Sequence, residues 1–247
     1  QEQNSYAGVT NKFLARRADK ICVAYPDMER FFPKDKIVLT GNPIRPAIEH
    51  LKAERRDALE HFGLPLDTER VVVVVGGSLG ARSINESIGS RLKDWADSGV
   101  ALIWQTGVAF EEKAKELLAG YHFPVYSSAF IQRMDLAYTI ADVVVSRAGA
   151  SAISELCLLG KPTILVPSPN VAEDHQTKNA LALSTRSAAI LIPDKEAREE
   201  LTPRAIALVK DATQCASLSE EIRKLALTSA ADKIVDEVEA LLSSKKE

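Results

Sequence analysis

The stretch VVVVVGGSLGARSIN, residues 71–85, joins five consecutive valines to a glycine-rich turn and then to a segment with helical spacing. A strand made only of β-branched residues fits a position covered on both faces, as in a parallel sheet with helices on each side. The turn offers free backbone N–H groups at the carboxyl end of that strand, where open α/β sheets bind ligands. This stretch therefore predicts a parallel α/β fold with a ligand-binding edge.

Comparable units recur through most of the chain. Helical patterns separate most of the apolar runs, as in the stripe formed by Ile84, Ile88, Leu92 and Trp95. Further strands are predicted at KICVAY (20–25), KIVLTG (36–41), ALIWQTG (101–107), HFPVYSS (122–128), DVVVSRAG (142–149), PTILVPS (162–168) and AAILI (188–192). This alternation predicts an α/β protein with a Rossmann-like, doubly wound parallel sheet.

The chain is divided at the sequence TGNPIRP, where glycine and proline interrupt the pattern. Residues 1–40 hold too few elements for a core of their own, and we expect them to be the tail end of an N-terminal domain. Residues 41–228 form the main domain, whose pattern is helical only from about Pro203 onward. We expect the amphipathic helix in residues 229–247 to pack back on the N-terminal domain, although packing on its own domain is the commoner arrangement.

The composition excludes several classes of protein. Lys and Arg number 31 against 34 Asp and Glu, so the net charge of -3 gives no global basis for nucleic-acid binding. The apolar runs are too short to span a bilayer. Cys22, Cys157 and Cys215 are far apart, which indicates free thiols in a reducing compartment, and no Cys/His cluster has metal-ligand spacing. The N-terminus lacks an initiator Met and the features of a signal peptide, so we interpret Gln1 as an internal position of a longer protein.

The turn after the valine run contains Gly76, Gly77, Ser78 and Gly80. Its spacing differs from the Gly-x-Gly-x-x-Gly pattern of dinucleotide-binding proteins, and the next strand ends at Gln105 instead of an acidic residue, which argues against NAD. The turn can be purely structural, because strand-to-helix turns favour glycine. As a binding element it would present N–H groups and the Ser78 hydroxyl to a ligand.

A second candidate element is SRAGASAISELCLLGKPTILVPSP, residues 146–169, where small residues separate a strand from a helix. The free N–H groups at the start of that helix can bind an anion such as a diphosphate. Glu155 lies about one turn inside the helix, where its carboxylate could accept hydrogen bonds from a ribose diol. Alternatively, Glu155 only stabilises the helix as an acidic residue near its N-terminus.

Two further segments complete the candidate site. In PNVAEDHQTKNALAL, residues 169–183, the amides of Gln176 and Asn179 suit sugar hydroxyls. His175 could act as an acid or base near neutral pH, although a lone loop histidine is more often only solvated. Ile131 could flank a flat base while its backbone reads the base edge, although without context it would be a core residue. Since these segments follow strands of one sheet, we expect them to converge at one edge.

Taken together, these segments closely resemble the MurG family of bacterial glycosyltransferases. The resemblance is carried, in order and with compatible spacing, by QEQNSYAGVTNKFLA, TGNPIR, GGSLGARSIN, WQTG, ADVVVSRAGASAISEL and PSPNVAEDHQTKNALAL. It implies the donor-binding half of a glycosyltransferase-B fold. It also implies an inverting enzyme that transfers N-acetylglucosamine from UDP-N-acetylglucosamine to the C4 hydroxyl of lipid I, giving lipid II for peptidoglycan, with no cofactor and no metal.

The resemblance also implies roles for individual residues. The donor site would contain Asn4 facing the cleft, Arg45 near the diphosphate, Ser78 against the donor, Ile131 at the uracil, Ala150, Ser151, Ala152, Ile153 and Ser154 under the phosphates and sugar, Glu155 at the ribose and Gln176 at the N-acetylglucosamine hydroxyls. His175 stands where some relatives have another glutamine, and the loop before Gln176 is a residue longer than in some of them. The exact sugar contacts therefore stay open.

The resemblance further implies a peripheral enzyme at the cytoplasmic face of the inner membrane, active in cell-wall synthesis, cell shape and cell division. Lipid I would bind an N-terminal domain whose glycine-rich loop and histidine lie upstream of Gln1. No catalytic residue is then expected in this chain, which should bind the donor but turn it over poorly. The alternatives are another UDP-sugar glycosyltransferase, a UDP-sugar epimerase, or a non-catalytic interaction module whose glycine turns are only structural.

Overall fold

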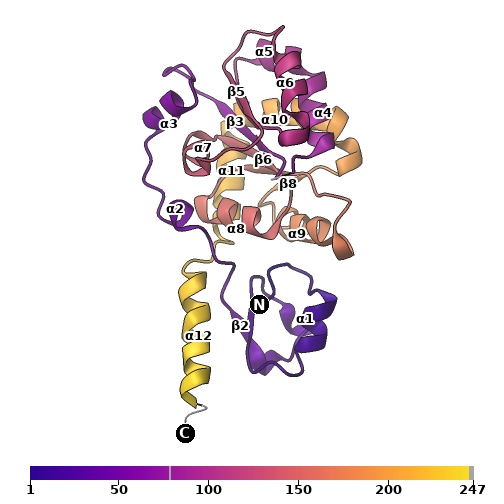
Figure 1. The fold of residues 1–247 in the computed structure, drawn as a ribbon, viewed down its shortest axis with the longest axis vertical. Coiled ribbons are helices and arrows are strands. Elements are labelled where there is room, and N and C mark those ends of the chain that lie inside the picture. Colours follow the sequence, from indigo (N-terminus) through magenta and orange to yellow (C-terminus); the bar gives the residue numbers. More distant parts are fainter. Residues whose placement is uncertain (78, 245–247) are drawn as a thin grey trace.

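The computed structural model describes residues 1–77 and 79–244, and within them six strands form a parallel sheet in the order β5-β4-β3-β6-β7-β8 (Figure 1). These strands are β3 (Val71–Val75), β4 (Ala101–Gln105), β5 (Val125–Ser128), β6 (Val143–Ser146), β7 (Thr163–Leu165) and β8 (Ile190–Leu191). The predicted Rossmann-like fold is confirmed. The strand order changes direction between β3 and β6, and such a switch point opens a crevice at the carboxyl ends of the strands.

The register of the central strands sets the level at which the turns begin. Val75, the last residue of β3, pairs with Gln105 at the end of β4 and with Ser146 at the end of β6. The glycine-rich turn and the small-residue loop therefore leave the sheet side by side, as the sequence predicted.

Helices cover both faces of the sheet because alternate valines of β3 point to opposite sides. Val71 and Val73 belong to one core, which is covered by α3 (Arg55–His61), α7 (Met134–Ile140), α8 (Ala150–Leu159) and α9 (His175–Ser184). Val72 and Val74 belong to the other core, with Trp95 and Trp104, and that core is covered by α4 (Arg82–Ser90), α5 (Leu92–Ser98), α6 (Glu111–Leu118), α10 (Ala197–Lys210) and α11 (Ala212–Arg223). Two apolar layers thus pack against the two faces of the sheet.

The C-terminal helices begin earlier than the sequence predicted. Helix α10 starts at Ala197, and Pro203 lies inside it rather than at its first turn. Proline normally occupies the first turn of a helix and is unfavourable inside one. However, Ala197 and Leu201 are buried in the core, and this packing extends the helix upstream of the proline. A turn separates α10 from α11, and in it Asp211 accepts a hydrogen bond from the Gln214 N–H at 2.9 Å and so caps α11.

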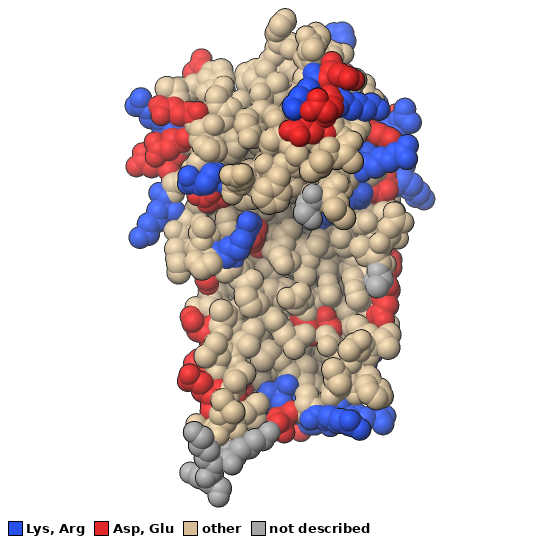
Figure 2. Space-filling model, viewed as in Figure 1, with Lys and Arg blue, Asp and Glu red and all other residues tan. Residues whose placement is uncertain are grey.

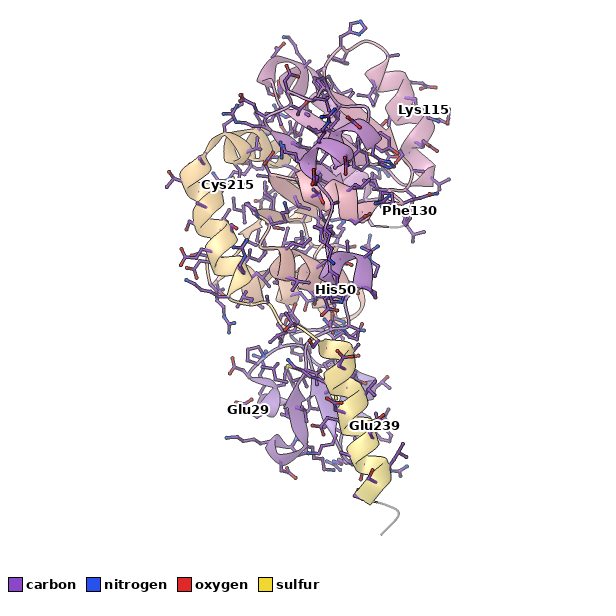
Figure 3. All side chains as sticks on the ribbon, turned by 90° about the vertical axis from the view of Figure 1, so that its left-hand side faces the viewer. Glu29, His50, Lys115, Phe130, Cys215 and Glu239 are labelled. Carbon is purple, nitrogen blue, oxygen red and sulfur yellow. The ribbon has the colours of Figure 1, made fainter. Side chains whose placement is uncertain are left out.

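Residues 1–40, which we call the small unit, do form an apolar cluster of their own, so the expectation that they hold too few elements for a core was wrong. The small unit contains α1 (Val9–Leu14) and the parallel pair β1 (Ile21–Val23) and β2 (Ile37–Leu39). A linker with α2 (Pro46–Glu49) leads to the sheet domain, and α12 (Ala230–Ser244) returns to lie beside the small unit (Figures 1 and 3). Short 3-10 turns complete the fold at Met28–Arg30, Lys34–Lys36, Val108–Phe110, Ala172–Asp174 and Asp194–Glu196.

Candidate functional site

An open cleft of about 610 Å³ lies at the carboxyl ends of β3 and β6, at the switch point of the sheet. Its walls come from the turn after β3, the start of α8, the loop after β7 and the start of α9. The lining includes Gly76, Gly77, Gly80, Arg147, Gly149, Ala152, Ser168, Gln176 and Asp194. Figure 2 shows few charged side chains across the middle of this view, between charged regions above and below. The cleft is where a doubly wound sheet binds its ligand.

The glycine-rich turn is held by close backbone contact with the neighbouring turn. Gly80 has φ +76°, and a Cβ there would lie 2.4 Å from the carbonyl oxygen of Thr106. Gln105 donates a hydrogen bond from Nε2 to the Gly77 carbonyl at 2.8 Å, and Asn85 donates one to the Thr106 carbonyl at 2.7 Å. The packing of the two turns therefore requires glycine at position 80, and the same packing positions the backbone at the cleft. Ser78 lies outside the described residues.

Helix α8 begins at the cleft with its first N–H groups facing an open space. Gly149 precedes the helix with extended backbone, φ -71° and ψ 145°, and it has no side chain with which to cap the helix. A Cβ at Gly149 would meet no described atom within 4 Å. Because Gly149 and Ala152 line the cleft, an anion there can accept hydrogen bonds from the start of α8 and interact with its dipole.

Gln176 joins two loops at the floor of the cleft. Its Oε1 accepts hydrogen bonds from the backbone N–H of Ala148 at 3.2 Å and of Ser168 at 2.9 Å. Among the described residues its Nε2 has no hydrogen-bond partner, so the two N–H bonds of that amide can reach a ligand. The predicted role of Gln176 at a sugar hydroxyl is compatible with this geometry and stays a prediction.

Asn179 has a different task from the one inferred from the sequence. It is fully buried, its Oδ1 accepts from the Ser5 N–H at 2.9 Å, and its Nδ2 donates to Asn4 Oδ1 at 3.0 Å and to the Ala148 carbonyl at 3.3 Å. A side chain used in this way cannot also hold a sugar. Asn179 and Asn4 instead fasten the N-terminal segment to the loop after β6.

Glu155 lies on α8 three residues beyond Ala152, on the same side of the helix, but unlike Ala152 it is buried and is not among the residues that line the cleft. Its buried carboxylate accepts a two-pronged bond from Arg45, with Oε1 2.8 Å from Nε and Oε2 2.9 Å from Nη2. Hydrogen bonding to Glu155 raises the pKa of Arg45, and burial followed by the Glu155 carboxylate raises the pKa of Tyr138. The structure therefore places Arg45 on Glu155, and does not place it among the residues that line the cleft.

The remaining predicted residues fall on different sides of the site. Ile153 is buried, and Ser154 accepts a hydrogen bond from Asn42 at 3.1 Å on the linker side of α8, so neither lines the cleft. The side chain of Ile131 is buried, and its N–H lies 3.4 Å from Gln105 Oε1. Its neighbour Phe130 is exposed and projects from the sheet domain in Figure 3. Ala150 and Ser151 form the first turn of α8.

His175 does not line the cleft, and its Nε2 lies 3.4 Å from Glu173 Oε2. The two residues before it, Glu173 and Asp174, both have φ +53°. This left-handed turn directs the helix start of α9 toward the small unit, where the Val9 N–H donates to Glu173 at 3.2 Å. The geometry gives no support to a catalytic His175.

Arg147 is the residue that sequence reasoning missed. Its guanidinium donates to the carbonyls of Val166 at 3.0 Å and Pro167 at 3.1 Å, to Ser83 Oγ at 3.1 Å and to the Asp194 carboxylate. The side chain is only 15% exposed and lines the cleft. The sequence feature that could have identified Arg147 is its position directly after β6, between the strand and the small residues. The positive charge of Arg147 lies at the switch point, paired with the Asp194 carboxylate.

The comparisons with known proteins show which family the chain resembles. The model of the glycosyltransferase family 28 C-terminal domain matches residues 71–237. A relative in Porphyromonas gingivalis W83, named UDP-N-acetylglucosamine--N-acetylmuramyl-(pentapeptide) pyrophosphoryl-undecaprenol N-acetylglucosamine transferase, is 61% identical over the whole chain. A protein of the same name in Parabacteroides distasonis is 55% identical over 99% of the chain.

Among solved structures, MurG from Acinetobacter baumannii superposes with a TM-score of 0.76 and 30% identity over 97% of this chain. The chain spans 65% of the length of the Porphyromonas protein, 67% of the Parabacteroides protein and 65% of the Acinetobacter structure.

Proposed function

The chain belongs to glycosyltransferase family 28 as a homologue of the MurG enzymes, and from this we propose that it forms the donor-binding part of a UDP-N-acetylglucosamine transferase. The complete enzyme would transfer N-acetylglucosamine to the C4 hydroxyl of lipid I and so make lipid II for peptidoglycan. The observation that carries this proposal is the cleft at the switch point, where the uncapped start of α8 faces the glycine-rich turn.

The proposed donor pose follows the surface of α8. The diphosphate would lie at the first turn of α8, near Gly149, with the sugar extending toward the free Nε2 of Gln176. The ribose would lie about one turn along the helix at Glu155, whose carboxylate has lone pairs left beyond the two that accept from Arg45. The base would lie beyond the ribose, near the backbone of Ile131 and the exposed ring of Phe130.

The proposed reaction is an inverting displacement. The C4 hydroxyl of the acceptor attacks the anomeric carbon, the bond from that carbon to the diphosphate oxygen breaks, and UDP leaves with the bonding electrons. Negative charge grows on the leaving diphosphate, so the N–H groups of α8 and the positive charge of Arg147 interact more strongly with the transition state than with the bound substrate. We assign the base that takes the hydroxyl proton to the acceptor domain.

We propose that the small unit and α12 belong to the acceptor half of the enzyme. Lys20 and Glu237 join the two at 3.8 Å. Large apolar side chains stay exposed on them, namely Val9, Phe13, Leu14, Leu39, Val235, Val238 and Leu242. An apolar face of this kind marks an interaction surface, and the relatives are longer than this chain.

We also propose that the complete enzyme acts as a peripheral protein on the cytoplasmic face of the inner membrane, where lipid I would be available to it. In the described part of the chain, no helix has both the length and the apolar character needed to cross a membrane.

Calorimetry with UDP, UDP-N-acetylglucosamine and ADP tests the donor proposal. We expect UDP and UDP-N-acetylglucosamine to bind and to raise the melting temperature of the chain, because a ligand of the native state stabilises it by mass action. ADP should bind much more weakly. Absence of heat and of stabilisation with both uridine ligands would favour the non-catalytic interaction module. Product analysis with the complete enzyme separates transfer to lipid I from epimerisation of the sugar.

Replacing Glu155 with alanine is expected to weaken UDP binding by about 1–3 kcal/mol, because the ribose hydroxyls would lose their hydrogen-bond acceptor. The sharper measurement compares UDP with 2′-deoxy-UDP on both proteins. The loss on mutation should be smaller for the deoxy ligand, since it lacks one of the hydroxyls that Glu155 would hold.

Glu60→Ala is the matched control, because Glu60 also pairs with an arginine, Arg56, but lies on the exposed surface of α3 and not among the residues that line the cleft. It should leave both affinities nearly unchanged. Equal losses for UDP and 2′-deoxy-UDP in the Glu155 variant would remove Glu155 from contact with the 2′-hydroxyl.

A further inference from the structure

The side-chain amide of Asn179, on α9, joins the small unit to the loop that precedes α8. Its Oδ1 accepts from the Ser5 N–H at 2.9 Å, and its Nδ2 donates to Asn4 Oδ1 at 3.0 Å and to the Ala148 carbonyl at 3.3 Å. Ser5 and Asn4 belong to the small unit, whereas Ala148 lies directly before the N-cap of α8. Because Asn179 is fully buried, its amide depends on these three partners.

The backbone of Ala148 is held on both sides, and this sets the direction of the next peptide group. Its N–H donates to Gln176 Oε1 at 3.2 Å, and its carbonyl accepts from Asn179. The peptide between Ala148 and Gly149 is trans, so its carbonyl and its N–H point to opposite sides. The Gly149 N–H is therefore turned away from Asn179.

The Gly149 N–H is available to a ligand. Gly149 lines the donor cleft, and within the part of the chain that the structure describes its N–H donates no hydrogen bond. It lies next to the uncapped first turn of α8, where the helix dipole favours negative charge. An oxygen of a diphosphate is the acceptor that suits this group.

The small unit determines which way the Asn179 amide faces. The Ser5 N–H requires an oxygen opposite it, while Asn4 Oδ1 and the Ala148 carbonyl each require a donor. Only one of the two orientations of the amide satisfies all three partners. Asn4 is held in turn by the buried Glu2 carboxylate, which accepts from its backbone N–H at 3.0 Å. A continuous series of hydrogen bonds thus runs from the small unit to the donor cleft.

We infer that Asn179 is a positioning residue of the donor site, which holds the peptide before α8 so that the Gly149 N–H faces the diphosphate. Ser5 and Asn4 keep Asn179 in the orientation that this requires. The small unit therefore contributes to diphosphate binding through Asn179. This inference rests on the proposed donor function and adds to it the group that orients one of the phosphate-binding N–H groups.

The Gly149 N–H can be removed by a substitution that fits the local backbone. Gly149 has φ -71°, a value that proline adopts, and a Cβ there would meet no described atom within 4 Å. Gly149→Pro should weaken UDP binding about 10- to 100-fold, because a hydrogen bond to a charged oxygen is lost. Gly149→Ala adds a Cβ but keeps the N–H, and its loss should be much smaller. Equal losses in the two variants would overturn the role of this N–H.

Asn179→Leu tests the positioning role, because leucine keeps the size of the side chain and removes all three hydrogen bonds. NMR titration should show UDP and pyrophosphate binding weakened about tenfold, the effect of one misplaced hydrogen bond. Uridine has no phosphate, so its affinity should not change. A loss of uridine affinity equal to that of UDP would mean that Asn179 has only a structural role, and would overturn the inference.

Thr202→Val is the control for the loss of a buried hydrogen bond away from the cleft. Thr202 is fully buried between α10 and α4, and its hydroxyl donates to the Ser87 carbonyl at 3.3 Å. This variant should lower the melting temperature and leave the affinities for UDP, pyrophosphate and uridine unchanged. It therefore separates loss of stability from loss of the phosphate-binding geometry.

Asn4→Ala tests the contribution of the small unit. It should weaken UDP binding in the wild-type chain but have no further effect in Asn179→Leu, because both changes remove support from the same peptide. Additive losses would mean that Asn4 acts on the ligand directly, and would overturn the coupling. If Asn179→Leu fails to fold, the comparison of UDP with uridine on Asn4→Ala and Gly149→Pro decides.

The wild-type chain separates failure of this inference from failure of the donor proposal. Binding of pyrophosphate with a shift of the Gly149 amide resonance, but no binding of UDP, would contradict the donor proposal alone. Binding of UDP that is unaffected in Asn179→Leu would overturn the inference and leave the donor proposal intact. Binding of neither ligand would overturn both.

Discussion

Replacing Arg147 with methionine is expected to weaken UDP binding by about 100-fold and to lower the free energy of unfolding by about 2–3 kcal/mol. Methionine keeps much of the side-chain length but removes the charge and every N–H donor. The Asp194 carboxylate, 24% exposed, would lose its ion pair. The carbonyls of Val166 and Pro167 would lose the donor that ties the loop after β7 to the loop after β6. The cleft would become both more negative and less ordered, and each change would lower its affinity for a diphosphate.

Two further variants separate these effects. Arg147→Lys keeps the charge but cannot form the same set of bonds, so we expect an intermediate loss of affinity and of stability. Arg56→Met is the control for loss of an arginine, because Arg56 pairs with Glu60 on an exposed helix with its side chain 74% exposed. It should change stability by less than about 0.5 kcal/mol. Calorimetry with UDP and urea denaturation give the two readouts. Unchanged UDP affinity in Arg147→Met would assign Arg147 a purely structural role.

The sheet could be predicted from the sequence because its strands have a local signal with one physical explanation. An unbroken apolar run such as Val71–Val75 is stable only where both faces of the strand are covered, so the run predicts a central strand with helices on each side. The convergence of the turns after Val75 and Ser146 followed from the parallel topology alone, and the strand register confirms it. The start of α10 could not be predicted in this way, because tertiary packing of Ala197 and Leu201 decided it.

The site could be predicted only in part, because contacts between distant segments have no local signal. Glu155 was selected for its place near a helix start, but its partner Arg45 stands 110 residues away on the linker. Asn179 was interpreted as a sugar ligand because its helix also carries Gln176. In the structure its side chain is instead hydrogen-bonded to the N-terminal segment, through the Ser5 N–H. Arg147 was passed over because its importance depends on Asp194, Ser83 and two loop carbonyls, none of which is near it in the sequence.

Alanine substitutions of the glycines in the turn after β3 are expected to have the second large effect on stability and on UDP binding. Gly77 and Gly80 both have positive φ, +84° and +76°, so alanine at either one costs about 1 kcal/mol in backbone strain. Only Gly80 also lies against another backbone. Its new Cβ would stand 2.4 Å from the Thr106 carbonyl oxygen and 3.1 Å from the Cα of Gly107, whereas a Cβ at Gly77 would meet no described atom within 4 Å.

We therefore expect Gly80→Ala to lower the free energy of unfolding by about 3 kcal/mol and Gly77→Ala by about 1 kcal/mol, measured by urea denaturation. The contact is between two main chains, which cannot turn aside as a flexible side chain can, so the turns after β3 and β4 must separate. That separation moves the glycine-rich wall of the cleft, and UDP affinity should fall in Gly80→Ala more than in Gly77→Ala. Gly107→Ala meets the same contact from the other side, with its Cβ 2.6 Å from the Cα of Gly80, and should reproduce both losses. Equal destabilisation by Gly77→Ala and Gly80→Ala would mean that backbone strain alone, and not the packing of the two turns, holds this wall in place.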